Sequence, residues 1–128
     1  MLKLPLNLPI FLCAQPADMR RSFDGLAQMV REFLGEDPLS GHLFVFRNKR
    51  AYRLKLLYWD RDGYAIWYKR LETGSFQLPA ISPDAVAIEL SLTQLTLILS
   101  GIDLRHARQR KRYQRPMPQA EKSIGAPL

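Results

Sequence analysis

The sequence has few of the residues on which metal centres and nucleophilic catalysis depend. It contains one cysteine, Cys13, and two histidines, His42 and His106, in 128 residues. A lone cysteine forms neither an internal disulfide nor a cysteine-based zinc cluster, and it suits a reducing compartment. We therefore expect no metal, no cofactor and no small-molecule ligand.

Long hydrophobic runs are also lacking. No apolar stretch approaches the roughly 20 residues that a helix needs to cross a bilayer. The opening segment Met1–Pro9 holds one cation and then prolines, without the unbroken apolar core and small-residue cleavage site of a secretory signal. These absences predict a cytoplasmic protein with no membrane partner.

Positive charge is what the sequence does have, and it is unevenly distributed. The net charge is +7, with 19 Lys and Arg against 12 Asp and Glu. Residues 1–104 are close to neutral, whereas residues 105–128 hold seven cations and one acid. We predict a single globular domain over 1–104, followed by a basic and flexible C-terminal arm over 105–128. Such an arm commonly contacts nucleic acid, although it also serves solubility or an acidic protein partner.

The N-terminal half predicts one strand and one long helix. Ile10–Ala14 is an apolar run with proline on either side, which is typical of a short strand. Over Met19–Leu34 apolar residues recur at intervals of three and four, which is helical spacing. Asp18 is placed to cap the start of this helix, and Gly35 to end it.

Three strands of an antiparallel meander are predicted next, over His42–Arg47, Arg53–Trp59 and Tyr64–Leu71. A polar turn at 48–51 joins the first two. The turn at 60–63 joins the last two, with Gly63 expected to adopt positive φ. Because neighbouring strand residues point to opposite faces, we expect the side chains of Trp59 and Trp67 to share one face, opposite those of Tyr58 and Tyr68.

The sequence between the meander and the basic arm predicts a short edge strand at 76–78, a brief pairing segment at 85–90 and a second helix. Ser91 and Gln94 have the spacing of a capping box. Gly101 marks the end or a kink, and the helix has an apolar stripe at Leu92, Leu95, Leu99 and Ile102. The fold class is therefore α+β: a small, mostly antiparallel sheet with one long helix in the N-terminal half, a second C-terminal helix and a basic tail. If both helices cover the same face of the sheet, the other face presents an aromatic patch to a protein partner or to a second copy.

Several segments have a characteristic order and spacing: Pro16–Leu26, Leu39–Arg50, Lys55–Gly63, Trp67–Phe76 and Leu95–Asp103. Together they resemble a known family, the TnpB (Orf2-like) accessory proteins of sixty-six-type (IS66) insertion sequences, over roughly residues 8–104. The resemblance implies a role in transposition beside a separate transposase and a second small protein encoded by the same element. The family brings no established catalytic residues.

A mobile-element protein invites a search for the acidic triad that holds two metal ions. The available acids are Asp18, Asp24, Asp60, Asp62, Glu89 and Asp103. Asp60 and Asp62 flank a predicted hairpin turn, where aspartate stabilises the backbone, and Asp18 fits a helix cap. We therefore expect no enzyme activity.

Two groups of cations are the candidate nucleic-acid contacts. Five lie within nine residues around the first predicted turn: Arg47, Lys49, Arg50, Arg53 and Lys55. Six lie in the arm: Arg105, Arg108, Arg110, Lys111, Arg112 and Arg115. Within the turn group, Tyr52 is placed to stack on an unpaired base. The alternative is that the turn cations form only a solvated edge, where lysine and arginine discourage strand-to-strand aggregation. Arg20 and Arg21 could join the same surface.

These observations predict a non-catalytic accessory protein that assists a transposase and contacts DNA with low sequence specificity. A protein-binding adaptor without DNA binding, an RNA-binding regulator and a cryptic nuclease that depends on Asp60 or Asp62 stay open as alternatives.

Overall fold

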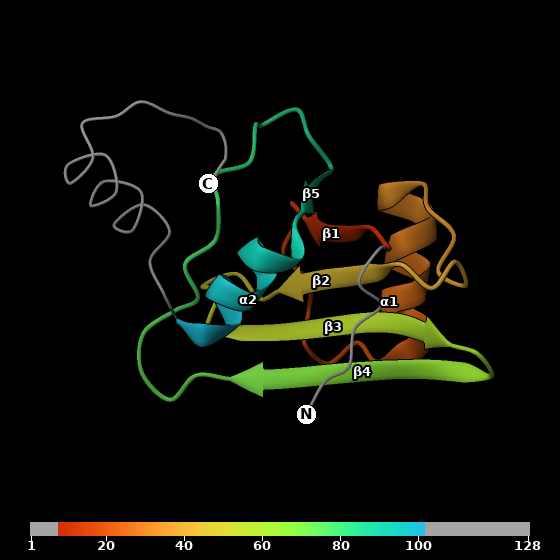
Figure 1. The fold of residues 1–128 in the computed structure, drawn as a ribbon, viewed down its shortest axis with the longest axis horizontal. Coiled ribbons are helices and arrows are strands. Elements are labelled where there is room, and N and C mark those ends of the chain that lie inside the picture. The colour runs from red at the N-terminus through yellow and green to blue at the C-terminus, as the bar shows by residue number, and fades with distance from the viewer. Residues whose placement is uncertain (1–7, 102–128) are drawn as a thin grey trace.

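A five-stranded sheet forms the centre of the protein, as a computed structural model of residues 8–101 shows (Figure 1). The strands stand in the order β4-β3-β2-β1-β5. Their bounds are β1 Ile10–Cys13, β2 Leu43–Arg47, β3 Arg53–Asp60, β4 Gly63–Arg70 and β5 Ala87–Leu90. The helices are α1 Phe23–Met29, continued by the π-helical turn η1 Val30–Leu34, and α2 Leu92–Ser100. The predicted α+β class with a mostly antiparallel sheet is confirmed.

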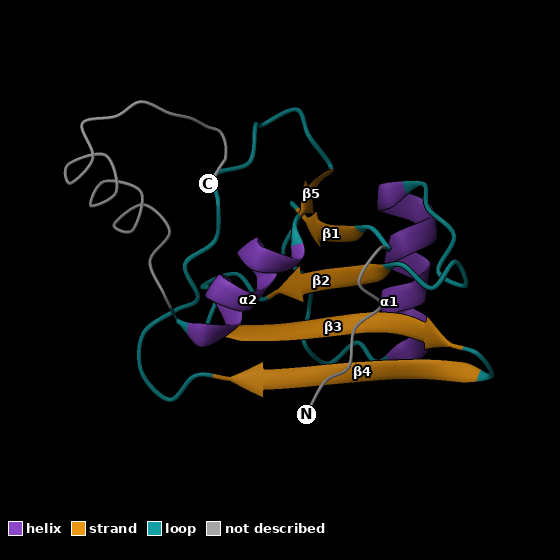
Figure 2. Ribbon diagram, viewed as in Figure 1, coloured by secondary structure: helices purple, strands orange, loops and turns teal. Residues whose placement is uncertain are grey.

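The sheet combines a meander with one parallel crossover. Strands β2, β3 and β4 pair antiparallel in sequence order, as predicted. Strand β1 pairs parallel with β2 and antiparallel with β5. A parallel pair needs a long connection, and here α1 and η1 lie within the connection between β1 and β2. A long connection of turns and loop returns the chain from β4 to β5 on the far side of β1 (Figure 2).

Helices cover both faces of the sheet, so the condition for an uncovered aromatic face is not met. Side chains of β2 alternate, with Phe44 and Phe46 packed in the cluster that holds Leu26 and Val30 of the first helical segment. Leu43 and Val45 of the same strand pack in the other cluster, with Leu95 and Ile98 of α2. The molecule therefore has three layers and two apolar cores.

The first helix starts later than predicted. It begins at Phe23, four residues beyond Met19, and the chain from there to Leu34 is helical. Asp18 does not cap it: its Oδ1 accepts a hydrogen bond from the backbone N of Arg20 at 2.9 Å, which forms a local turn instead. The predicted end is confirmed, because Gly35 adopts the left-handed conformation with φ 64°.

The turn between β3 and β4 differs from the prediction in one detail that rearranges the aromatic residues. Positive φ is adopted by Arg61, at 55°, while Gly63 becomes the first residue of β4. Asp60 then pairs with Gly63, and the same register pairs Leu56 with Trp67.

Because of this register, Trp59 and Trp67 point to opposite faces, and the predicted arrangement is wrong. Trp59 is paired with Tyr64, and their rings meet edge to face with centroids 5.1 Å apart. Trp67 packs with Tyr58 against the core cluster that includes α2 residues.

After β4, the predicted second helix is confirmed and one predicted strand is absent. Residues 76–78 form no strand; instead Phe76 is buried and its backbone N donates to the Ala51 carbonyl oxygen at 2.7 Å. The capping box is present: Gln94 N donates to Ser91 Oγ at 3.0 Å, and Ser91 N donates to Gln94 Oε1 at 2.8 Å. Helix α2 ends at Gly101, with φ 80°. Leu95 is buried and Leu92 and Leu99 are partly buried, as predicted, whereas Ile102 and the basic arm lie outside the described residues.

Candidate nucleic-acid interface

The turn between β2 and β3 presents two of the predicted cations to solvent. Its backbone is held by the side chain of Asn48, whose Oδ1 accepts hydrogen bonds from Tyr52 N and Arg53 N, each at 3.0 Å. Ala51 adopts positive φ, 59°. Lys49 and Arg50 are exposed within this turn, where a phosphate has access to both.

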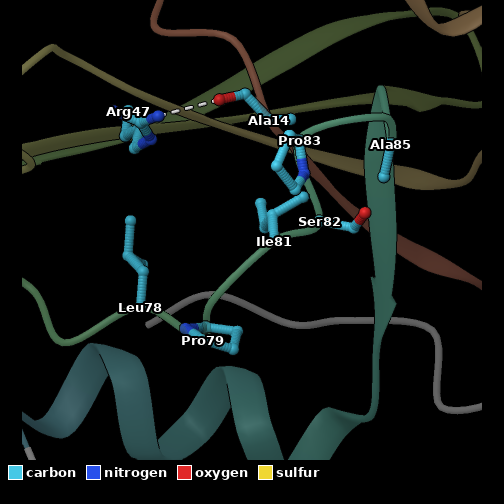
Figure 3. A pocket seen from close by; sticks show the side chains of 8 residues that line it. All are labelled: Ala14, Arg47, Leu78, Pro79, Ile81, Ser82, Pro83 and Ala85. Atoms are coloured by element: carbon cyan, nitrogen blue, oxygen red, sulfur yellow. Dashed lines mark hydrogen bonds between the residues drawn. The ribbon is translucent and has the colours of Figure 1, made fainter.

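Arg47, at the end of β2, is engaged within the fold. Its Nη2 donates to the carbonyl oxygen of Ala14 at 2.8 Å, which ties the segment after β1 to β2 (Figure 3). Its Nη1 also donates to the Lys49 carbonyl oxygen at 3.4 Å. A cavity of about 300 Å³ adjoins the guanidinium, with Ala14, Leu78, Pro79, Ile81, Ser82, Pro83 and Ala85 as its other lining residues. Among the described residues that line this cavity, Arg47 is the one with an ionisable side chain.

Lys55 is buried, with 7% of its surface exposed, and it has a structural role. Its Nζ donates to the carbonyl oxygens of Met19 and Arg21 at 2.8 and 2.7 Å. The same ammonium group lies 4.7 Å from the ring centroid of Tyr68. Lys55 therefore attaches the segment before α1 to the sheet and leaves its charge with little access to a phosphate.

Arg53 lies between two tyrosines at the start of β3. Its Nη1 donates to the hydroxyl oxygen of Tyr68 at 3.0 Å, and its guanidinium carbon is 5.4 Å from the ring centroid of Tyr52. The hydrogen bond to Tyr68 raises the pKa of Arg53 above its ordinary value. Tyr52 is half-buried beside this cation, which restricts the stacking surface that the sequence predicted for it.

Strand β4 adds two cations that the turn motif alone did not reveal. Its register pairs Arg70 with Arg53 and Lys69 with Leu54, so both added cations lie at the same end of the sheet as the turn. Both are exposed, and Arg70 forms an ion pair with Glu72 at 3.0 Å. The missed signal was the hairpin at 60–63, because the register that it imposes brings Arg70 beside Arg53.

Arg20 and Arg21 lie near the same end of the sheet, because Lys55 of β3 binds the carbonyl oxygens of Met19 and Arg21. We call this pair of hydrogen bonds the Lys55 anchor. Arg20 is exposed and forms an ion pair with Asp18 at 2.6 Å. Hydrogen bonds from the side chain and the backbone of Arg20 lower the pKa of Asp18 below its usual value. Arg21 donates from Nη1 to the Gly25 carbonyl oxygen at 3.2 Å and is also exposed.

The two ends of β3 and β4 therefore differ in charge. Among the described residues, nine cations gather around one end, against the carboxylates of Asp18, Asp24 and Glu72. These cations are Arg20, Arg21, Arg47, Lys49, Arg50, Arg53, Lys55, Lys69 and Arg70. We call this end the basic end. The hairpin at the other end carries Asp60, Arg61 and Asp62, all exposed.

Other chemistry is sparse in the described part of the chain. Residues 8–101 contain no group of three or more His, Cys, Asp or Glu side chains arranged to hold a metal ion. None of the helices in this range is long and apolar enough to cross a membrane. Cys13 is buried, and burial raises the pKa of its thiol.

Comparisons with known proteins agree with the sequence resemblance. The sequence profile of the IS66 Orf2-like proteins matches residues 8–109. An uncharacterized protein of Sinorhizobium fredii, y4jC, is 38% identical over 110 residues, which cover 86% of this chain and 92% of that protein. A second from the same organism, y4hO, is 40% identical over 103 residues, covering 80% of this chain and 88% of that protein. No solved structure matches the chain.

Proposed function

The chain belongs to the family of IS66 Orf2-like proteins, and from that premise we propose that it is a non-catalytic accessory protein in the transposition of an insertion sequence. It acts beside a separate transposase and a second small protein of the same element, and it holds DNA through phosphate contacts. The observation that carries the DNA contact is the gathering of exposed cations at one end of the sheet.

Four exposed side chains form the core of the proposed contact: Lys49 and Arg50 from the turn, and Lys69 and Arg70 from β4. Arg20 and Arg21 lie on the segment that Lys55 attaches to the sheet, and they extend this group of cations. Cations of this kind contact phosphate oxygens whatever the base sequence, so the proposal is binding with low sequence specificity. Arg47, Arg53 and Lys55 support this surface through their bonds to Ala14, Tyr68 and the segment before α1.

The arm cations at 105–115 extend the same proposal. Six phosphate contacts there would by themselves give the logarithm of the affinity a slope of about −5 against the logarithm of salt concentration. The basic end adds to that slope, so its contribution is measurable as a difference between variants of the full chain.

The test compares full-length variants binding to terminal-repeat DNA and to scrambled DNA of equal length across a salt series. The variant Lys49→Gln with Arg50→Gln should weaken binding equally on both DNAs and reduce the salt slope by about two, because two phosphate contacts are lost. Arg61→Gln is the matched control, since it removes an exposed cation from the opposite end of β3 and β4. Changing the six arm cations to glutamine measures the arm separately.

A double variant with an unchanged slope would remove the basic end from the contact. A wild-type chain that binds neither DNA at low salt would refute DNA binding and favour the protein adaptor. Tighter binding to single-stranded RNA than to duplex DNA would favour the RNA-binding regulator.

A further inference from the structure

Strand β4 forms one edge of the sheet and has the features of a pairing surface. In the described range, 8–101, no strand lies on its outer side. It is eight residues long, pairs with β3 without a bulge, and contains neither proline nor charge from Gly63 to Tyr68. Edges of monomeric sheets are normally short, or are interrupted by charge, proline or a bulge. The opposite edge, β5, fits that description with four residues and Glu89 among them.

The hydrogen-bonding phase of β4 shows which residues face outward. Leu71 N donates to the Tyr52 carbonyl oxygen at 2.8 Å, so residue 71 bonds towards β3. In an antiparallel pair the backbone N–H and C=O groups of successive residues point alternately towards and away from the partner strand. Residues 65, 67 and 69 therefore also bond towards β3. The outward N–H and C=O groups therefore belong to Tyr64, Ile66, Tyr68 and Arg70.

We propose that β4 pairs antiparallel with β4 of a second copy of this chain, with the two Ile66 residues opposite each other on a two-fold axis. The two sheets would then form one continuous sheet through an isologous interface. Outward residues must face outward residues, which this register satisfies: Tyr64 lies opposite Tyr68 of the other copy. About six backbone hydrogen bonds form between the two β4 strands.

Charge complementarity favours this register over the one with Trp67 on the axis. With Ile66 on the axis, Arg70 lies beside the turn residue Asp62, which directly precedes β4 of the other copy. Moving the axis to Trp67 would instead place Glu72 opposite Asp62, and like charges directly opposite each other are unfavourable. Asp62 and Arg70 are both exposed, and Arg70 would exchange or share its present ion pair with Glu72 to make this contact.

The side chains along the joined edge are compatible with pairing. Tyr64 and Ile66 pack at the edge of one core cluster and are only half-buried, and Tyr68 is 46% exposed. On the other face, Trp67 would lie beside Ala65 of the second copy. Aromatic and branched pairs of this kind stabilise neighbouring strands.

Sedimentation equilibrium of the full chain in moderate salt, without DNA, tests the proposal. The wild type should be dimeric at high concentration and should dissociate to monomer as it is diluted. Ile66→Lys should weaken association more than roughly tenfold, because it places two ammonium groups together on the axis. Val86→Lys is the control: it also replaces a branched apolar residue with lysine, at an exposed position beside β5, and it should leave association unchanged.

A charge exchange tests the register with exposed residues that leave the core intact. Asp62→Arg should weaken the dimer about tenfold, since two facing pairs become repulsive. Adding Arg70→Asp should restore association, because the pairs are attractive again in reversed order. A wild type that stays monomeric at every concentration overturns the proposal, as does an exchange that fails to restore a dimer weakened by Asp62→Arg.

Discussion

Replacing Lys55 with methionine should destabilise the fold and loosen one side of the basic end. Methionine has a similar length and apolar volume but no ammonium group. The substitution therefore removes the two hydrogen bonds to the carbonyl oxygens of Met19 and Arg21 and the contact with the ring of Tyr68. These contacts connect the segment before α1 to β3 and β4.

The expected loss is about 2–3 kcal/mol in the free energy of unfolding. Each hydrogen bond to a charged group contributes about 1.5–3 kcal/mol, and the relief of burying a charge offsets part of the loss. For a domain of this size the melting temperature should fall by roughly 10 °C.

Urea unfolding followed by circular dichroism measures the free energy, and hydrogen exchange of residues 19–25 measures the local loosening. Lys69→Met is the matched control, because it removes an exposed lysine from the neighbouring strand and should change stability by less than about 0.5 kcal/mol. If Lys55→Met and the wild type have equal free energies of unfolding, the hydrogen bonds of Lys55 contribute nothing to stability, and the prediction is refuted.

Two further predictions concern stability. Ser91→Ala removes the oxygen that accepts from Gln94 N and should cost about 1 kcal/mol in denaturant unfolding, whereas Thr93→Ala in the same turn should cost clearly less; equal losses would contradict the capping role. The pKa of Cys13 is raised by burial, so its stabilising contribution is complete below the ordinary thiol value of 9.0 and is lost as pH rises above it. Cys13→Ala should therefore lose less stability than wild type between neutral pH and pH values above 9.0, and an identical pH dependence would contradict this.

Local patterns in the sequence predicted most elements of the fold. The three meander strands, the capping box at Ser91 and the end of the first helix at Gly35 depend on alternation, spacing and single-residue conformations, all of which are written locally. The start of the first helix failed because Asp18 had two local options. It formed a turn with Arg20 rather than a helix cap, and Lys55 then took up the carbonyls of Met19 and Arg21.

The candidate site was predicted in part. The cluster from Arg47 to Lys55 is visible as a run of cations, but the sequence does not show which of them face solvent. Arg47 and Lys55 donate to carbonyl oxygens that lie 33 and 36 residues away along the chain, and such pairing is settled only when distant segments pack. Lys69 and Arg70 were missed for the same reason.

The sequence by itself determined the three meander strands, the capping box of α2, the turn of cations and the family to which the chain belongs. Tertiary structure decided which of these residues meet. The parallel insertion of β1 between β2 and β5 and the hairpin register at Asp60 and Gly63 place the aromatic residues on two faces and the cations at one end. The physical reason is that strand pairing and burial link residues far apart in the chain. Local propensity specifies each segment but not its neighbour.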